Sequence, residues 1–216
     1  MTPEAFVAAH TAIAAAPLVP EVRLHLATEL TPLWEATEAW MEARDIEPPF
    51  WAFAWPGSQA LARWVLDEPS RVAGLRVLDF AAGGGLAAIA AALSGAAAVE
   101  AAEIDLLAHA AIRLNAALNE VAVTAAGGAA DDVVGSAGYW DLILAGDVCY
   151  EAPMTGHILP WLRALAAGGA TVILADPGRA YVPREGLEAV AAYRVPVTRE
   201  LEDCDEREVI LYRLRA

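Results

Sequence analysis

Cysteine, histidine and basic residues are scarce in this 216-residue chain. It holds two cysteines and four histidines, and 14 basic residues face 29 acidic ones, which gives a net charge of −15 at pH 7. The cysteines and histidines are scattered without metal-ligand spacing, so we expect no metal centre and two free thiols in a reducing compartment. Without a basic stripe to neutralise phosphates, non-specific binding to nucleic acid is not expected.

Long apolar runs and targeting signals are also missing. Residues 81–102 are nearly uncharged, but they are mostly alanine and glycine and follow a strand–turn–helix–strand pattern, which argues against a membrane span. The first four residues lack the positive charge of a signal peptide. We therefore expect a cytoplasmic protein with no membrane partner, and a length that suits one domain with a sizeable core.

A glycine turn between a short apolar segment and an alanine-rich helix pattern is the most informative feature. The apolar segment ends at Asp79, and the turn contains Gly83 and Gly85. Glycines let a ligand approach the unpaired N–H groups at a helix start. A second apolar strand ends at Glu103, whose carboxylate can accept both hydroxyl protons of a ribose. These features predict a nucleoside-cofactor site.

Two cofactors compete for this site. Gly83, Gly85 and Ala88 satisfy the loose dinucleotide fingerprint, and Glu103 follows at about the usual ~20 residues, which would suit NAD. Asp79 favours S-adenosylmethionine, because a carboxylate at the mouth of the loop would repel a pyrophosphate but attract an ammonium and a sulfonium. The structural alternative is that Asp79 only caps the loop. We expect S-adenosylmethionine.

The first third of the chain reads as short elements around an aromatic segment. Apolar spacing and prolines predict helices at 4–16 and 32–44, a short edge strand at 22–26, and a helix at 58–66 with Ser58 as its N-cap.

The rest of the chain alternates strands and helices, as in α/β proteins. We expect strands near 76–80, 97–103, 121–125, 141–146 and 170–175, and helices near 85–93, 106–119, 154–166 and 184–192. The tail predicts two strands, 193–201 and 207–214, joined by the acidic turn 202–206.

This pattern matches the sheet of class I methyltransferases. We expect an α/β, Rossmann-like seven-stranded sheet with helices on both faces, a reversed strand in a C-terminal hairpin and an N-terminal helical extension. Residues 1–216 would form one methyltransferase domain, in which residues 1–57 are a helical and aromatic cap and residues 58–216 are the core.

Four segments of the chain carry a family resemblance: 50–61, 77–85, 103–105 with Asn115 and Asn119, and 140–150, which ends in Asp147-x-x-Tyr150. They resemble the seven-strand protein-lysine methyltransferases marked by an Asp-x-x-Tyr motif. Within this family the chain is most similar to the electron transfer flavoprotein β-subunit lysine methyltransferases, and residues 19–24 and 175–179 are similar to the same branch.

The resemblance implies roles for individual residues. Asp147 would orient the lysine ammonium and Tyr150 would shape its channel. Cofactor contacts are implied at Trp55, Asp79, Ala81, Gly83, Gly85, Glu103, Ile104 and Gly146. The structural alternatives are that Asp147 caps a turn, that Tyr150 is a core aromatic, and that Trp51, Phe53 and Trp55 pack the N-terminal segment onto the sheet.

The chain departs from the family in two places. Glu103 stands where an aspartate is usual, one methylene longer but still able to bind both ribose hydroxyls. After the third core strand, Ala126, Gly127 and Gly128 replace the polar or aromatic residue expected over the adenine. Asp131 or Asp132 could reach the adenine amine, or could belong to a solvated loop.

The function implied is S-adenosylmethionine-dependent methylation of lysines on the β-subunit of electron transfer flavoprotein. We expect the enzyme to be a monomer, although the sequence does not identify the oligomeric state. The alternatives are a small-molecule N-methyltransferase of the same fold, similar to nicotinamide methyltransferase, a binding module that has lost activity, and an NAD-dependent reductase. The sequence does not identify the target lysine or the number of methyl groups.

Overall fold

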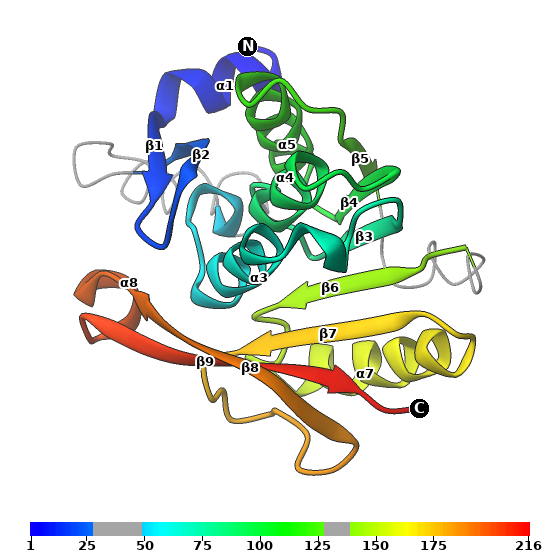
Figure 1. The fold of residues 1–216 in the computed structure, drawn as a ribbon. Coiled ribbons are helices and arrows are strands. Elements are labelled where there is room, and N and C mark those ends of the chain that lie inside the picture. The colour runs from blue at the N-terminus through cyan, green and yellow to red at the C-terminus, as the bar shows by residue number, and fades with distance from the viewer. Residues whose placement is uncertain (28–48, 128–138) are drawn as a thin grey trace.

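The computed structural model describes residues 1–27, 49–127 and 139–216. Its centre is a seven-stranded sheet in the order β5-β4-β3-β6-β7-β9-β8 (Figure 1). The strands are β3 (Arg76–Phe80), β4 (Ala98–Glu103), β5 (Thr124–Gly127), β6 (Leu142–Gly146), β7 (Thr171–Asp176), β8 (Leu187–Pro196) and β9 (Glu206–Leu214). Strands β3 to β7 run parallel, and β9 pairs antiparallel with both β7 and β8. The predicted sheet with one reversed strand in a C-terminal hairpin is confirmed.

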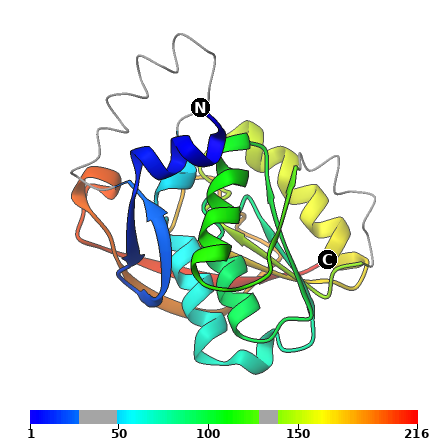
Figure 2. The same cartoon turned by 90° about the horizontal axis from the view of Figure 1, so that it is seen from above.

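Helices cover both faces of this sheet (Figure 2). On one face lie α3 (Pro56–Asp67), α4 (Leu86–Leu93) and α5 (Leu106–Leu118), and on the other lies α7 (Ala152–Ala167). Each strand supplies both cores because successive side chains point to opposite faces. On β6, Leu142 and Leu144 pack with α3 and α4, whereas Ile143 and Ala145 pack with α7.

The N-terminal region begins with a helix, as expected, but this helix is shorter than predicted. Helix α1 (Pro3–His10) ends at Thr11, and the chain then forms an antiparallel sheet of β1 (Ala12–Ala16) and β2 (Val19–Leu26). The prediction of a helix over 4–16 is therefore wrong in its second half, because pairing with β2 outweighs the helix propensity of the alanines. The predicted helix at 32–44 lies outside the described residues.

Three further predicted elements need correction. Helix α3 starts at Pro56 with Trp55 as its N-cap, and not with Ser58, because proline suits the first helical position. The expected helix at 184–192 is strand β8, whose residues 187–196 pair with β9. The predicted strand 193–201 therefore ends early, at Pro196, and a short helix α8 (Arg199–Glu202) precedes β9.

Asn115 connects the N-terminal sheet to the glycine turn. Its buried amide accepts a hydrogen bond from His25 N (2.7 Å) on β2 and donates one to Gly84 O (2.8 Å). On the same helix, Asn119 exchanges hydrogen bonds with the backbone of Arg23 at an exposed position. One face of α5 thus fixes β2 beside the turn.

Replacing Asn115 by leucine should destabilise the fold and weaken cofactor binding together. The change leaves the part-buried N–H of His25 and the buried C=O of Gly84 without partners, at up to about 1–3 kcal/mol for each. Asn119→Leu is the matched control, since water can replace its exposed hydrogen bonds, and we expect a much smaller effect. Thermal unfolding and calorimetric titration with S-adenosylhomocysteine would measure both. Equal losses in the two variants would contradict this role of Asn115.

Candidate active site

A cavity of about 480 Å³ opens at the carboxyl ends of the parallel strands. It lies where the strand order reverses between β3 and β6, the place at which open α/β sheets bind ligands. Its volume is within the range of small-molecule sites. Six of the eight predicted cofactor residues line it: Trp55, Ala81, Gly83, Glu103, Ile104 and Gly146. Both predicted catalytic residues, Asp147 and Tyr150, line it as well.

The glycine turn has the strained backbone that its sequence indicates. Ala81, Gly83 and Gly85 have φ values of +53°, +54° and +80°, in the left-handed region that favours glycine. Gly84 has no room for a side chain, since a Cβ there would lie 2.9 Å from Trp51 O. The turn therefore brings backbone close to the cavity, and Ala81 is held in a conformation that is costly for a residue with a Cβ.

Glu103 closes the turn from the neighbouring strand. Its Oε1 accepts a hydrogen bond from Gly83 N (2.8 Å), and its Oε2 accepts one from Ile104 N (3.0 Å). A carboxylate has about four acceptor positions, so two remain for the hydroxyls of a ribose. Burial raises the pKa of Glu103, which the two N–H donors partly offset. The residues present fit a nucleoside cofactor.

Asp79 is not on the cavity wall. Its buried Oδ2 accepts a hydrogen bond from Ala88 N (2.9 Å) in the first turn of α4, and Gly85 lies behind the turn as the N-cap of this helix. Burial raises the pKa of Asp79 to about 7, against the effect of that N–H. Asp79 Oδ2 therefore fulfils the capping alternative, and a direct contact of Asp79 with a sulfonium cofactor stays a prediction.

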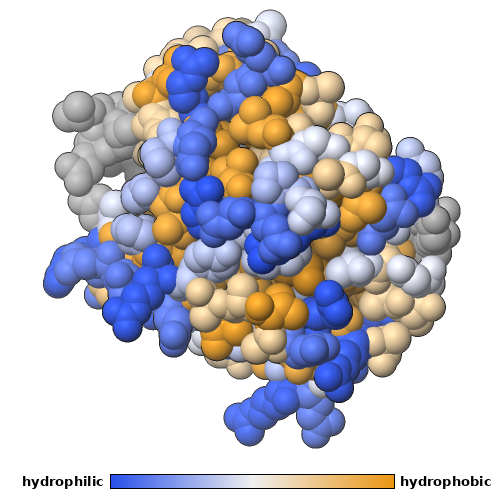
Figure 3. All heavy atoms as spheres, in the orientation of Figure 1, coloured by the Kyte–Doolittle hydropathy of each residue, from blue (hydrophilic) through white to orange (hydrophobic). Residues whose placement is uncertain are grey.

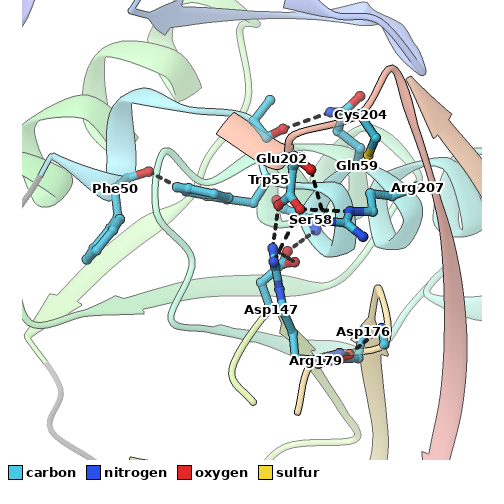
Figure 4. Close-up of polar contacts among 12 residues, drawn as sticks. Phe50, Trp55, Ser58, Gln59, Asp147, Asp176, Arg179, Glu202, Cys204 and Arg207 are labelled. Atoms are coloured by element: carbon cyan, nitrogen blue, oxygen red, sulfur yellow. Dashed lines mark hydrogen bonds and ion pairs between the residues drawn. The ribbon is translucent and has the colours of Figure 1, made fainter. Parts of the chain in front are cut away.

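The aromatic segment before α3 divides between core and cavity. Trp51 is buried against α5, and Phe53 packs beside it. Trp55 extends toward Phe50, and its Nε1 donates to Phe50 O (2.8 Å) (Figure 4). The Phe50 ring lies 5.9 Å from that of Trp55 and 6.2 Å from that of Tyr150. Phe50 and Tyr150 are 41% and 46% exposed, so these two rings form a rim and Tyr150 is not a core aromatic.

Asp147 follows β6 in a left-handed conformation, with φ at +57°. Its side chain is 13% exposed, and its Oδ2 accepts a hydrogen bond from Ser58 N (3.2 Å) at the start of α3. Its Oδ1 is buried and makes no hydrogen bond within the described residues. Burial raises the pKa of Asp147 to about 7, although Arg179, with Nη2 3.9 Å from Oδ1, lowers it. Asp147 Oδ1 can therefore accept a hydrogen bond from a cationic group that enters the cavity.

Gly57 lets α3 approach Asp147. A Cβ at this position would lie 2.5 Å from Asp147 Oδ2 and 2.8 Å from Ala175 O. Gly57→Ala should therefore cost about 1–3 kcal/mol of stability, as overpacking does, and displace Asp147. Gly156→Ala in α7 is the control, because nothing lies within 4 Å of its added Cβ and we expect slight stabilisation. Urea unfolding and methyl transfer would be measured for both variants; unchanged activity of Gly57→Ala would show that Asp147 tolerates the displacement.

Sequence reasoning missed part of the cavity wall. Met154, His157 and Ile158 reach it from α7, and Arg179 reaches it from the loop after β7. The i, i+3, i+4 spacing of the α7 residues, directly after the site strand, was an available signal. Asp131 and Asp132 lie outside the described residues. The described residues contain no group of three or more potential ligands arranged for a metal ion, and no described helix is long and apolar enough to cross a membrane.

Comparisons with known proteins find methyltransferases that share this fold. Residues 61–148 match the family of ribosomal protein L11 methyltransferase (PrmA). Among solved structures, magnesium protoporphyrin IX methyltransferase from Synechocystis PCC 6803 with bound S-adenosylmethionine superposes with a TM-score of 0.54 at 18% identity, over 74% of this chain and 78% of that one. A Pyrococcus abyssi tRNA (uracil-54, C5)-methyltransferase with S-adenosylhomocysteine gives 0.53 at 15% identity, over 73% and 38%.

Three relatives are similar over most of the chain, and all three are electron transfer flavoprotein β-subunit lysine methyltransferases. The Xenopus laevis protein is 41% identical over 82% of this chain and 71% of its own length. The Danio rerio protein is 39% identical over 83% and 70%, and the Homo sapiens protein is 37% identical over 75% and 61%. The predicted fold and the predicted cofactor, S-adenosylmethionine, are confirmed.

Proposed function

The chain belongs to the family of the electron transfer flavoprotein β-subunit lysine methyltransferases, and from this premise we propose that it methylates lysines on the β-subunit of electron transfer flavoprotein. One observation carries the assignment of the site. Asp147 presents a buried oxygen without a hydrogen-bond partner in the described chain, on the wall of a cavity that also holds the glycine turn and Glu103. A lysine ammonium supplies the hydrogen-bond donor that this oxygen lacks.

The chemistry requires alignment more than acid–base power. S-adenosylmethionine supplies a methyl group on a sulfonium, which is already a good leaving group. A free lysine has a pKa near ~10.4, so its amine must lose a proton before it can act as a nucleophile. In our proposal, Asp147 holds the ammonium by a charge-assisted hydrogen bond, and the rings of Tyr150 and Phe50 confine the side chain. Proton loss to water then exposes the lone pair.

We propose that all eight predicted residues serve cofactor binding, six by direct contact and two indirectly. Glu103, Gly83, Ala81, Ile104, Trp55 and Gly146 would face the cofactor, since they line the cavity. Asp79 and Gly85 would act from behind, by fixing the start of α4 against the turn.

We further propose that residues 1–216 form a single domain that works as a monomer in the cytoplasm. Residues of β1 and β2 share one hydrophobic core with α3 and α4, which supports a single folding unit. Both cysteines are free, as is usual in a reducing compartment. Light scattering would give the oligomeric state, and cell fractionation would give the location.

The substrate is tested by incubating the purified enzyme with labelled S-adenosylmethionine and intact electron transfer flavoprotein, with nicotinamide in a parallel reaction. The chain contains no lysine, so any labelled methyl-lysine comes from the flavoprotein. We expect mass increments of one or more methyl groups on β-subunit peptides. Replacing the modified lysines by arginine should abolish the label. Labelled nicotinamide beside an unmodified flavoprotein would favour a small-molecule methyltransferase instead.

A further inference from the structure

Two guanidinium groups and three carboxylates meet beside the cavity, and three of these five side chains have no role in the proposed lysine site. Asp147 follows β6, Asp176 ends β7, Arg179 lies in the loop after β7, Glu202 ends α8 and Arg207 lies on β9. Figure 4 shows Asp147, Arg179, Glu202 and Arg207 pointing toward one another from these separate elements.

Glu202 is the carboxylate that binds Arg179 most closely. Its side chain is 1% exposed, and both of its oxygens contact the Arg179 guanidinium, with 3.2 Å from Arg179 Nη1 to Oε2. Arg207 adds a second cation, with 2.9 Å from Nε to Oε2 and 2.9 Å from Nη2 to the backbone oxygen of Glu202. The other terminal nitrogen of Arg179, Nη2, lies 3.9 Å from Asp147 Oδ1. The two side chains form an ion pair at this distance but no hydrogen bond.

The burial of Glu202 is unusual for its surroundings. In Figure 3 hydrophilic side chains gather over the end of the β8–β9 hairpin that carries α8, and Arg199, Asp203 and Asp205 are exposed there. Glu202 instead turns inward. A buried carboxylate is costly unless it is paired and hydrogen-bonded, and here its partners are the two arginines.

The loop after β7 presents Arg179 in a fixed direction. Asp176 Oδ1 accepts hydrogen bonds from Gly178 N (2.7 Å) and Arg179 N (2.6 Å), which closes the turn. Asp176 Oδ2 is buried and makes no hydrogen bond within the described chain, like Asp147 Oδ1. The cluster therefore has two unused buried acceptors, and with all five groups ionised its three carboxylates and two guanidinium groups leave one negative charge. That charge matches one incoming ammonium.

We propose that Glu202 is a positioning residue that keeps Arg179 at ion-pair distance from Asp147 and out of hydrogen-bond range, and so leaves Asp147 Oδ1 open to a hydrogen bond from the substrate ammonium. This inference rests on the proposed function, because it concerns the lysine side of the same site. Without Glu202, Arg179 would close the 3.9 Å gap and occupy the oxygen that the ammonium requires. A guanidinium in that place would be a permanent competitor of the substrate.

The pH dependence of methyl transfer reports this competition. Ionised Asp147 and a deprotonated amine are both required, so log kcat/KM should rise with a slope of two below the pKa of Asp147 and a slope of one above it. The break should lie near pH 7 in the wild type, where burial places this pKa. The charged and titratable groups around Asp147 are Arg179, Asp176, Glu202 and Cys149. Burial is the main reason that the pKa of the Cys149 thiol is raised to about 12. Tyr150 and His157 line the same cavity.

Glu202→Gln keeps the size of the side chain and removes its charge. We expect KM for the protein substrate to rise about tenfold, equivalent to roughly 1.4 kcal/mol, and the break to move about one pH unit lower because Arg179 then pairs with Asp147. Arg207→Gln is the matched control, since it also removes a partner of Glu202 but leaves Arg179 held. In Arg207→Gln the break in the pH profile should stay near pH 7. Equal effects of the two variants would reduce Glu202 to a structural residue and overturn the inference.

Arg179→Gln should move the break in the opposite direction. Asp147 would lose the cation that lowers its pKa, so the break should rise above pH 7. The double variant Arg179→Gln/Glu202→Gln should behave like Arg179→Gln alone, because Glu202 acts through Arg179. Additive effects would contradict this. The Arg179→Gln measurement remains informative even if Glu202→Gln fails to fold. A break that stays near pH 7 in Arg179→Gln would overturn the inference.

A titration without substrate separates this inference from the proposed function. Carbon-detected NMR can follow the Asp147 carboxyl, assigned by its absence in Asp147→Asn. We expect a lower pKa for Asp147 in Glu202→Gln than in the wild type, whether or not the flavoprotein is methylated. Equal pKa values would overturn the role of Glu202, whereas an unmodified flavoprotein with shifted pKa values would overturn only the substrate.

Discussion

Asp147→Asn is expected to reduce methyl transfer by about 2–4 kcal/mol of transition-state stabilisation, which is roughly 30- to 1,000-fold in kcat/KM. The asparagine keeps the shape of the side chain but cannot attract the ammonium. Asparagine also tolerates the left-handed backbone at this position, where φ is +57°, so the loss would reflect charge and not refolding of the turn.

Two controls define this result. The calorimetric affinity for S-adenosylhomocysteine should change little, because the change affects the lysine side of the cavity. The pH profile should lose its break near pH 7, since the titrating carboxyl is gone. Near-full turnover by Asp147→Asn would show that another group receives the substrate.

Gly83→Val should abolish cofactor binding. Gly83 has φ at +54°, a conformation that a β-branched residue adopts only at high cost, and its N–H donates to Glu103 Oε1. Relaxing the backbone would move this N–H and release the Glu103 carboxylate from its position. The nearest atom to an added Cβ is Trp51 Cα at 3.7 Å, so the expected damage comes from backbone strain and loss of the ligand surface and not from a clash with the core.

Gly95→Val is a suitable comparison for Gly83→Val. Gly95 also has a positive φ, of +84°, and nothing lies within 4 Å of its added Cβ, but it follows α4 far from the cavity lining. Both variants should lose thermal stability, and only Gly83→Val should lose binding of S-adenosylhomocysteine by calorimetry. Retained micromolar binding in Gly83→Val would show that the turn does not contact the cofactor.

The sequence predicted the sheet because its signals are local. Apolar runs ending at Asp79, Glu103 and Gly146 sit on adjacent parallel strands, so their ends had to meet at one edge. The same reasoning placed Glu103 and Asp147 on one cavity. Where alanine dominates, local signals fail: residues 12–16 and 187–196 are strands because of their pairing partners, which alanine content does not reveal.

The direction of a side chain was the other limit of sequence reasoning. Asp79 was expected to face the ligand, but the first turn of α4 offers it an N–H at Ala88. Arg179 and Glu202 lie 23 residues apart, and only the return of β8 and β9 beside β7 brings them together. No spacing rule predicts such a contact, because it depends on the final position of a hairpin end.

The hydrogen bonds of Asn115 also give the cofactor a remote reporter. Because one amide group joins Gly84 in the turn to His25 on β2, tightening of the turn by a bound ligand must also stabilise the N-terminal sheet. The His25 amide should therefore exchange its hydrogen for deuterium more slowly when S-adenosylhomocysteine is present, although β2 is not part of the cavity wall. Hydrogen exchange within the first 27 residues of the chain would then report whether the cofactor site is occupied.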